Sequence, residues 1–276
     1  MRSVLRAAIA ALFLSAPAMA QDAALVERGR YLVEVTAACG NCHTPKGPQG
    51  NLPGRELAGG FVIDAPPFRA VTSNITQDPE TGVGRWTDAQ IARAIREGIR
   101  PDGSLIGPPM PFEFYRNLSD RDLQAMVAYL RTVPPIRNAV EKSTYRIPLP
   151  PSYGPPVTSV APPADNPVAR GAYLAGPVAH CLECHTPMGA NGHLEMARLG
   201  AGGQQFPGPG GVAIARNLTP TGLGQWSDAE IERAIRAGVS RDGTRLQPPM
   251  AFYAYANMSP QDMSDLIAYL RTLPPH

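Results

Sequence analysis

The pattern Cys-x-x-Cys-His occurs twice in this chain, once in each half. The first copy spans Cys39 to His43, the second spans Cys181 to His185, and a Thr-Pro pair follows both. The 276-residue chain has four cysteines, so the two motifs use all of them. Any fold for this sequence must therefore place two thiols beside an imidazole at two separate points.

This pattern is the attachment signal for c-type haem. Its two thiols can reach the two vinyl groups of a porphyrin, and the histidine that follows can bind the iron from below the ring. A thioredoxin-type redox pair would need a βαβ setting, and no strand pattern surrounds either motif. A zinc site would bring two Cys-x-x-Cys units much closer together in sequence. We therefore predict two covalently bound haems c, held by Cys39, Cys42, His43, Cys181, Cys184 and His185.

Other short segments recur in the same order, which indicates an internal duplication. Arg-Gly-x-Tyr-Leu begins at Arg28 and Arg170, and Ala-Tyr-Leu-Arg-Thr begins at Ala128 and Ala268. The repeat is far longer than the roughly 20–50 residues of a solenoid unit, so we expect two domains. The stretch between the copies is rich in proline and is predicted to be a semi-rigid connector on the surface. The expected regions are a signal peptide at 1–20, a first domain at 21–133, a linker at 134–167 and a second domain at 168–276.

Each copy gives three helix signals and no strand pattern, so the predicted fold class is all-α. The first helix is expected at about 23–38. The second begins at Thr87, which forms a capping box with Gln90, and the third begins at Ser119, with Asp122 as its capping partner. The second copy repeats these caps as Ser227 with Glu230 and Ser259 with Asp262. We expect the long loop between the first and second helices to pack on a large apolar cofactor.

The second axial ligand of each iron is predicted by comparing the copies. Of the nine methionines, only Met110 and Met250 occupy matching positions in the two halves of the mature chain. Both follow two prolines, whose fixed φ makes a stiff loop that can present a thioether at one place. We therefore expect Met110 and Met250 to bind iron opposite His43 and His185.

Two further sets of matched residues have predicted roles. A glycine on the first helix can let an aromatic ring of the third helix come close, and the candidate pairs are Gly29 with Tyr129 and Gly171 with Tyr269. Trp86 and Trp226 can donate the indole N–H to a buried haem propionate, or they can simply fill the core. Both interpretations of the tryptophans stay open at this point.

The first twenty residues are typical of a secretory signal peptide. Arg2 and Arg6 precede an apolar stretch, and Ala18-Met19-Ala20 has the form of a cleavage site. The apolar stretch is shorter than the roughly 20 residues needed to cross a bilayer, so we expect cleavage after Ala20 and no transmembrane segment. The chain has 25 Lys and Arg against 23 Asp and Glu, and without Arg2 and Arg6 the two balance. This neutrality gives no reason to expect a nucleic-acid partner, and the predicted location is the periplasm.

With these elements placed, the chain resembles the two-domain c-type cytochromes. Within that group it is similar to the cytochrome c subunits of bacterial alcohol, gluconate and sorbitol dehydrogenases. The resemblance is carried by Asn74-Ile75-Thr76, Thr81-Gly82-Val83-Gly84, Trp86-Thr87-Asp88, Pro108-Pro109-Met110-Pro111-Phe112 and Ala128-Tyr129-Leu130, and by their counterparts in the second half. It implies two tandem cytochrome c-like domains. Those subunits usually have three haem domains and a membrane-associating segment, so we expect here a periplasmic shuttle or a small subunit carried by a partner.

The predicted function is electron transfer and not catalysis. Histidine and methionine together would close both axial positions of each iron, and methionine ligation raises the reduction potential. We expect a periplasmic dehydrogenase as electron donor and a cytochrome or terminal oxidase as acceptor. The alternative is a catalytic haem protein, such as a thiosulfate dehydrogenase or a peroxidase, which would need one iron with an open or replaceable ligand.

Overall fold

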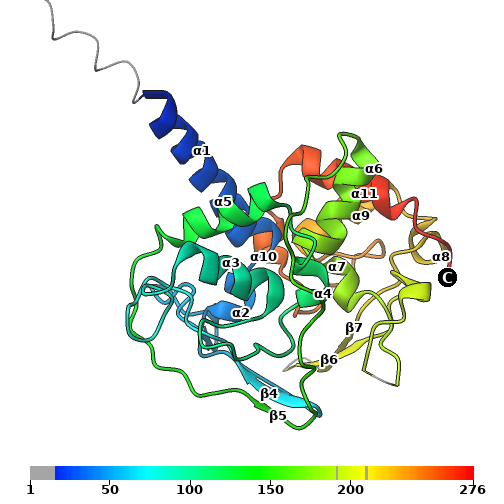
Figure 1. The fold of residues 1–276 in the computed structure, drawn as a ribbon. Coiled ribbons are helices and arrows are strands. Elements are labelled where there is room, and N and C mark those ends of the chain that lie inside the picture. Colours follow the sequence, from blue (N-terminus) through cyan, green and yellow to red (C-terminus); the bar gives the residue numbers. More distant parts are fainter. Residues whose placement is uncertain (1–15, 191, 209–210) are drawn as a thin grey trace, which may run out of the picture.

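The structure is a computed structural model that describes residues 16–190, 192–208 and 211–276 (Figure 1). Of the predicted signal peptide, residues 1–15 lie outside the described residues. Helix α1 (Ala16–Tyr31) begins before the predicted cleavage point and continues past it. Within the described residues, every helix is too short or too polar to cross a membrane.

The helices of the two halves follow the same order. In the first half, α1 continues into a π-helical turn, η1 (Leu32–Thr36), so the helix predicted at 23–38 is two segments. It is followed by α2 (Gly40–His43), α3 (Asp88–Glu97), α4 (Phe112–Tyr115) and α5 (Asp120–Leu130). The second half has α6 (Pro167–Tyr173), η2 (Leu174–Val178), α7 (Cys181–Cys184), η3 (Met196–Arg198), α8 (Pro220–Leu223), α9 (Asp228–Ala237), α10 (Phe252–Tyr255) and α11 (Pro260–Leu270).

The predicted starts of the second and third helices are correct in both halves, whereas the first helix begins at Ala16 and not at about 23. Helices α3 and α9 begin with reciprocal capping boxes, Thr87 with Gln90 and Ser227 with Glu230. Ser119 likewise accepts from the backbone of Asp122 at the start of α5. The Asp122 carboxylate, however, does not bond back to the cap, because Arg28 engages it in a two-pronged ion pair with both bonds at 2.9 Å.

The predicted close crossing of the first and third helices is confirmed in both halves. A Cβ added to Gly29 would lie 1.8 Å from the carbonyl oxygen of Ala125 and 2.8 Å from Cβ of Tyr129. A Cβ on Gly171 would lie 1.9 Å from the carbonyl oxygen of Asp265. Only a residue without a side chain allows two helix backbones to approach this closely.

The prediction of an all-α fold is wrong, because the chain also forms three small antiparallel sheets in its described part. The strands are β1 (Lys46–Gly47) with β2 (Gly50–Asn51), β3 (Val62–Ala65) with β4 (Phe68–Val71) and β5 (Thr144–Tyr145), and β6 (Gln205–Gly208) with β7 (Gly211–Ile214). The β3–β4 and β6–β7 hairpins lie at the lower edge in Figure 1. Their strands have four residues each, too few for an alternating pattern to stand out from the surrounding loop.

The proline-rich linker is tied to the first half. Its strand β5 pairs with β4, with Tyr145 opposite Phe68. Further along, the Tyr153 ring stacks on Phe112 with centroids 4.7 Å apart. The Val160 carbonyl then accepts from the backbone of Asp120, at the start of α5, at 2.9 Å. The linker therefore extends a sheet and caps a helix as well as spanning the two copies.

The two halves share their cores. Val35 and Ala38, just before the first motif, are buried in the cluster of the second half. Leu174 and Val178, just before the second motif, are buried in the cluster of the first half. Because each half completes the core of the other, the segments leading into both motifs are held at one interface.

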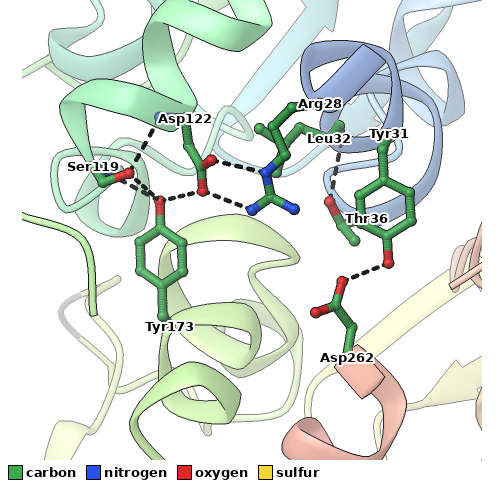
Figure 2. A network of polar contacts seen from close by, with 8 residues as sticks. All are labelled: Arg28, Tyr31, Leu32, Thr36, Ser119, Asp122, Tyr173 and Asp262. Carbon is green, nitrogen blue, oxygen red and sulfur yellow. Dashed lines mark hydrogen bonds and ion pairs between the residues drawn. The ribbon is translucent and has the colours of Figure 1, made fainter. Parts of the chain in front are cut away.

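Two tyrosines cross this interface in opposite directions, and we call them the tyrosine clasp (Figure 2). The Tyr31 hydroxyl donates to Asp262 at 2.6 Å and accepts from the backbone N–H of Ser259 at 2.9 Å, at the start of α11. Tyr173 makes the matching contacts at the start of α5, donating to Asp122 at 3.0 Å and accepting from the Ser119 N–H at 3.0 Å. Burial, followed by the nearby carboxylate, raises the pKa of Tyr31 to about 12, so its hydroxyl stays protonated at neutral pH.

We expect Tyr31→Phe and Tyr173→Phe each to lower the free energy of unfolding by about 1–3 kcal/mol, the usual value of a hydrogen bond to a charged group. The measurement is urea unfolding of the holoprotein. Tyr129→Phe is the matched control, because the Tyr129 hydroxyl bonds Glu34 on the exposed surface of one half. If Tyr31→Phe or Tyr173→Phe is as stable as Tyr129→Phe, the tyrosine clasp does not hold the halves together.

Candidate functional site

Both motifs begin after a residue with left-handed backbone conformation. Ala38 has φ of 47° and His180 has φ of 40°, and neither is glycine. This conformation is uncommon for residues with a side chain. It ends the π-helical turn and turns the chain into the short helix α2 or α7. The same local device therefore presents the cysteines and the histidine in each half.

The two motif histidines have the geometry of metal ligands. Nδ1 of His43 lies 2.7 Å from the Ser73 carbonyl oxygen, and Nδ1 of His185 lies 2.7 Å from that of Arg216. A carbonyl only accepts, so Nδ1 carries the proton and Nε2 keeps a free lone pair. Burial lowers the pKa of both imidazoles, which keeps them in the neutral form that binds metal.

The buried thiols of the four cysteines differ in pKa from those of a thioredoxin-type redox pair. All four thiols are free. Burial raises the pKa of Cys39 to about 12 and those of Cys42 and Cys181 to about 11, and it raises that of Cys184 as well. A thioredoxin-type thiol needs a lowered pKa. Among the described residues, no three His, Cys, Asp or Glu side chains gather as a metal site requires.

Each predicted methionine packs on the same apolar cluster as a cysteine and the tryptophan of its half. Met110 lies against the first cluster with Cys39 and Trp86. In the second half the corresponding residues are Met250, Cys181 and Trp226. The Pro-Pro peptide bond just before each methionine is cis. In each half, the structure thus places the predicted methionine, one motif cysteine and the tryptophan against one core.

The tryptophans are fixed through their backbone by arginines that sequence reasoning missed. Arg131 donates to the Trp86 carbonyl, and Arg271 donates to that of Trp226 at 2.5 Å. The same arginines pair with Asp88 and Asp228, two residues after each tryptophan. Arg131 and Arg271 belong to the repeated Ala-Tyr-Leu-Arg-Thr segment. The repetition of these arginines in both halves could have indicated that they have a role in the site.

The tryptophan of the second half borders a cavity lined by two arginines. Arg216, Trp226, Ser240, Arg241 and Asp242 line a cavity of about 350 Å³. Ser73 and Pro101 stand at the positions in the first half that correspond to Arg216 and Arg241. Trp226 therefore borders a space with two guanidinium groups, a setting that suits an anionic group at its rim.

These donors fit a c-type haem in each half. The set consists of two free thiols on one helical turn, an imidazole with Nε2 available, and a thioether on the same core. Thiols, imidazole and thioether are the groups that attach and ligate haem c. The apolar clusters around them would bury a flat apolar ring.

Comparison with known proteins agrees with this chemistry. The family model for cytochrome c matches residues 26–134 and 168–274. The alcohol dehydrogenase (quinone) cytochrome c subunit of Gluconobacter oxydans is 34% identical, over 95% of this chain and 57% of the relative. The gluconate 2-dehydrogenase cytochrome c subunit of Pantoea cypripedii is 31% identical, over 94% of this chain and 63% of the relative. A diheme cytochrome c-type protein of Cereibacter sphaeroides is 29% identical, over 86% of this chain and 82% of its own length.

The chain spans somewhat more than half the length of the alcohol dehydrogenase cytochrome c subunits that it matches. The resemblance drawn from the sequence motifs is confirmed, because two copies of the cytochrome c model cover most of the chain and the relatives include dehydrogenase cytochrome subunits. The chain belongs to the cytochrome c family.

Proposed function

We propose that this chain is a periplasmic di-haem cytochrome c that carries electrons from a dehydrogenase to a cytochrome or terminal oxidase. The first haem c is held by Cys39, Cys42 and His43 with Met110 as the other axial ligand. The second is held by Cys181, Cys184 and His185 with Met250. When bound, haem iron supplies one-electron transfer.

The observation that carries the proposal is the matched pair of imidazoles. Both donate Nδ1–H to a backbone carbonyl at 2.7 Å and leave the Nε2 lone pair free to bind a metal, at equivalent positions of the duplicated chain. A hydrogen bond from the other ring nitrogen to a carbonyl fixes the orientation of the imidazole and makes it a stronger metal ligand. The relatives named as dehydrogenase cytochrome subunits support a dehydrogenase as electron donor.

The residues of the chain would hold, orient and shield the cofactor. The thiols fix the ring covalently, and His43 and Met110, or His185 and Met250, leave no axial position for a substrate. The shared apolar cores would exclude water from the ring. This arrangement favours an electron carrier over the catalytic alternative, which needs a replaceable ligand at iron.

The test uses the full chain, matured in a cell with the c-type attachment machinery. After denaturation and acid–acetone extraction, we expect two haems to stay on each chain. The native ferrous protein should not react readily with carbon monoxide. Retention of fewer than two haems would contradict the di-haem assignment, and ready carbon monoxide binding at one haem would favour a catalytic role.

A further inference from the structure

The attachment turn of the first half contacts the methionine loop of the second half. Asn41, between the two cysteines of the first motif, donates from Nδ2 to the carbonyl oxygen of Pro249 at 2.9 Å. Pro249 directly precedes Met250 in the sequence. A Cβ on Gly40 would lie 3.8 Å from the Tyr253 hydroxyl, so α10 also lies next to this turn. One hydrogen bond therefore links the peptide of the first site to the ligand loop of the second.

The two halves that this bond connects are also held together by other contacts. Val35 and Ala38, which lead into the first motif, are buried in the second-half core. Tyr31, at the end of α1, is bonded to the start of α11 (Figure 2). Because these contacts already dock the two halves, forming the bond requires ordering only the Asn41 side chain and the loop beside it. Its effect is therefore on the local geometry of the methionine loop.

The corresponding position in the second half cannot make the same bond. Glu183 stands where the first motif has Asn41, and it pairs with His180 of its own half at 3.1 Å. An ionised carboxylate only accepts hydrogen bonds, so Glu183 has no proton to offer a carbonyl. The amide of Asn41 supplies the donor that the carbonyl of Pro249 needs. At these two positions, therefore, the first motif donates a hydrogen bond to the methionine loop of the second half, and within the described part of the chain the second motif makes no matching bond to the first half.

We propose that Asn41 is a positioning residue for Met250, through which the first half of the chain fixes the methionine loop of the second site. This inference rests on the proposed function, in which Met250 binds iron. Without the donor, the Pro249 carbonyl loses its partner and the loop gains freedom to move. An external ligand then displaces the Met250 sulfur more easily, while Met110 is unaffected.

The test uses Asn41→Asp, which keeps the shape of the side chain and removes its donor, in the two-haem protein. Imidazole is titrated into the ferric form, and the methionine methyl signals shifted by the haem ring current are recorded by NMR in the ferrous form. We expect imidazole to displace the second-site methionine at about threefold to tenfold lower concentration, as the loss of one hydrogen bond predicts. One methyl signal should move, and it should be the one that Met110→Ala retains.

Three further variants separate positioning from general damage. Asn41→Leu removes the donor without adding charge and gives the same expected result if aspartate impairs maturation. Asn41→Gln restores a donor and should recover much of the resistance to imidazole. Glu183→Gln, at the matched position, should leave both methyl signals in place.

Unchanged imidazole affinity with unmoved methyl signals in both Asn41→Asp and Asn41→Leu would overturn the inference and leave the proposed function intact. Movement of the first-site signal alone would overturn it too. If the wild-type protein shows no methionine signal at the second haem, the ligand assignment of the proposed function fails first. The two failures are thus distinguishable.

Discussion

Replacing Gly29 or Gly171 by alanine is expected to remove most of the folded, haem-bearing protein. At each position the new methyl group would lie less than 2 Å from a backbone carbonyl oxygen of α5 or α11. A backbone atom cannot rotate away as a side chain can, so the two helices must separate along their crossing. Overpacking typically costs about 1–3 kcal/mol and occasionally more. We expect the upper end here, because a backbone carbonyl blocks the new methyl group, against a total stability of roughly 5–15 kcal/mol for a domain.

The measurements for these variants are the yield of covalent haem and the midpoint of urea unfolding. Gly176→Ala is the matched control, because its added Cβ would make an ordinary contact 3.7 Å from the Phe114 ring. We expect the control to behave like the wild-type protein. If Gly29→Ala matured and unfolded like Gly176→Ala, the two helices would not be packed as closely as the structure has them.

The sequence alone predicts features whose cause is local or repeated. A capping box depends on residues three apart, so Thr87 and Ser227 mark the starts of α3 and α9 correctly. The close helix crossings at Gly29 and Gly171 can be predicted from the sequence, because duplication repeats a glycine and a tyrosine at similar spacing in both halves. The motif histidines and cysteines are found for the same reason, since their chemistry is contained in five residues.

Other features depend on how distant segments meet, and single-sequence patterns do not contain that information. The β3–β4 and β6–β7 hairpins use four-residue strands, which look like apolar loop. Strand β5 forms only because the linker happens to lie beside β4. Tyr31 repeats as Tyr173, yet a tyrosine on a helix gives no sign that its hydroxyl caps a helix of the other half.

The contrast between Asn41 and Glu183 has the same origin. Haem attachment places no requirement on the two variable positions of each motif. The difference between Asn41 and Glu183 therefore cannot be interpreted until the docking of the halves is known. Once Pro249 is seen beside Asn41, the need for a donor explains the difference. Duplication makes Asn41 and Glu183 equivalent positions. Their roles differ because only Asn41 faces a backbone carbonyl across the interface.

Met110→Ala and Met250→Ala are each expected to open one of two haem irons. A methyl group cannot replace the thioether, so the ferrous protein should bind carbon monoxide at about half of its haem. The reduction potential of that haem should fall by on the order of 0.1 V, because methionine ligation raises the potential and axial ligands tune it over a span of about 0.8 V. The measurements are a carbon monoxide difference spectrum and a redox titration of each variant.

The control for this pair is Met126→Leu. Met126 is buried on α5, only 1% exposed, and Leu266 stands at the matching position of the second half. A swap of similar volume in the core usually costs less than about 1.5 kcal/mol, so this variant should keep both spectra and both potentials. If Met110→Ala and Met250→Ala bind no more carbon monoxide than Met126→Leu, neither methionine is an iron ligand. In that case another side chain would have to close each axial position, and the Pro-Pro-Met loops would serve only to pack the two cores.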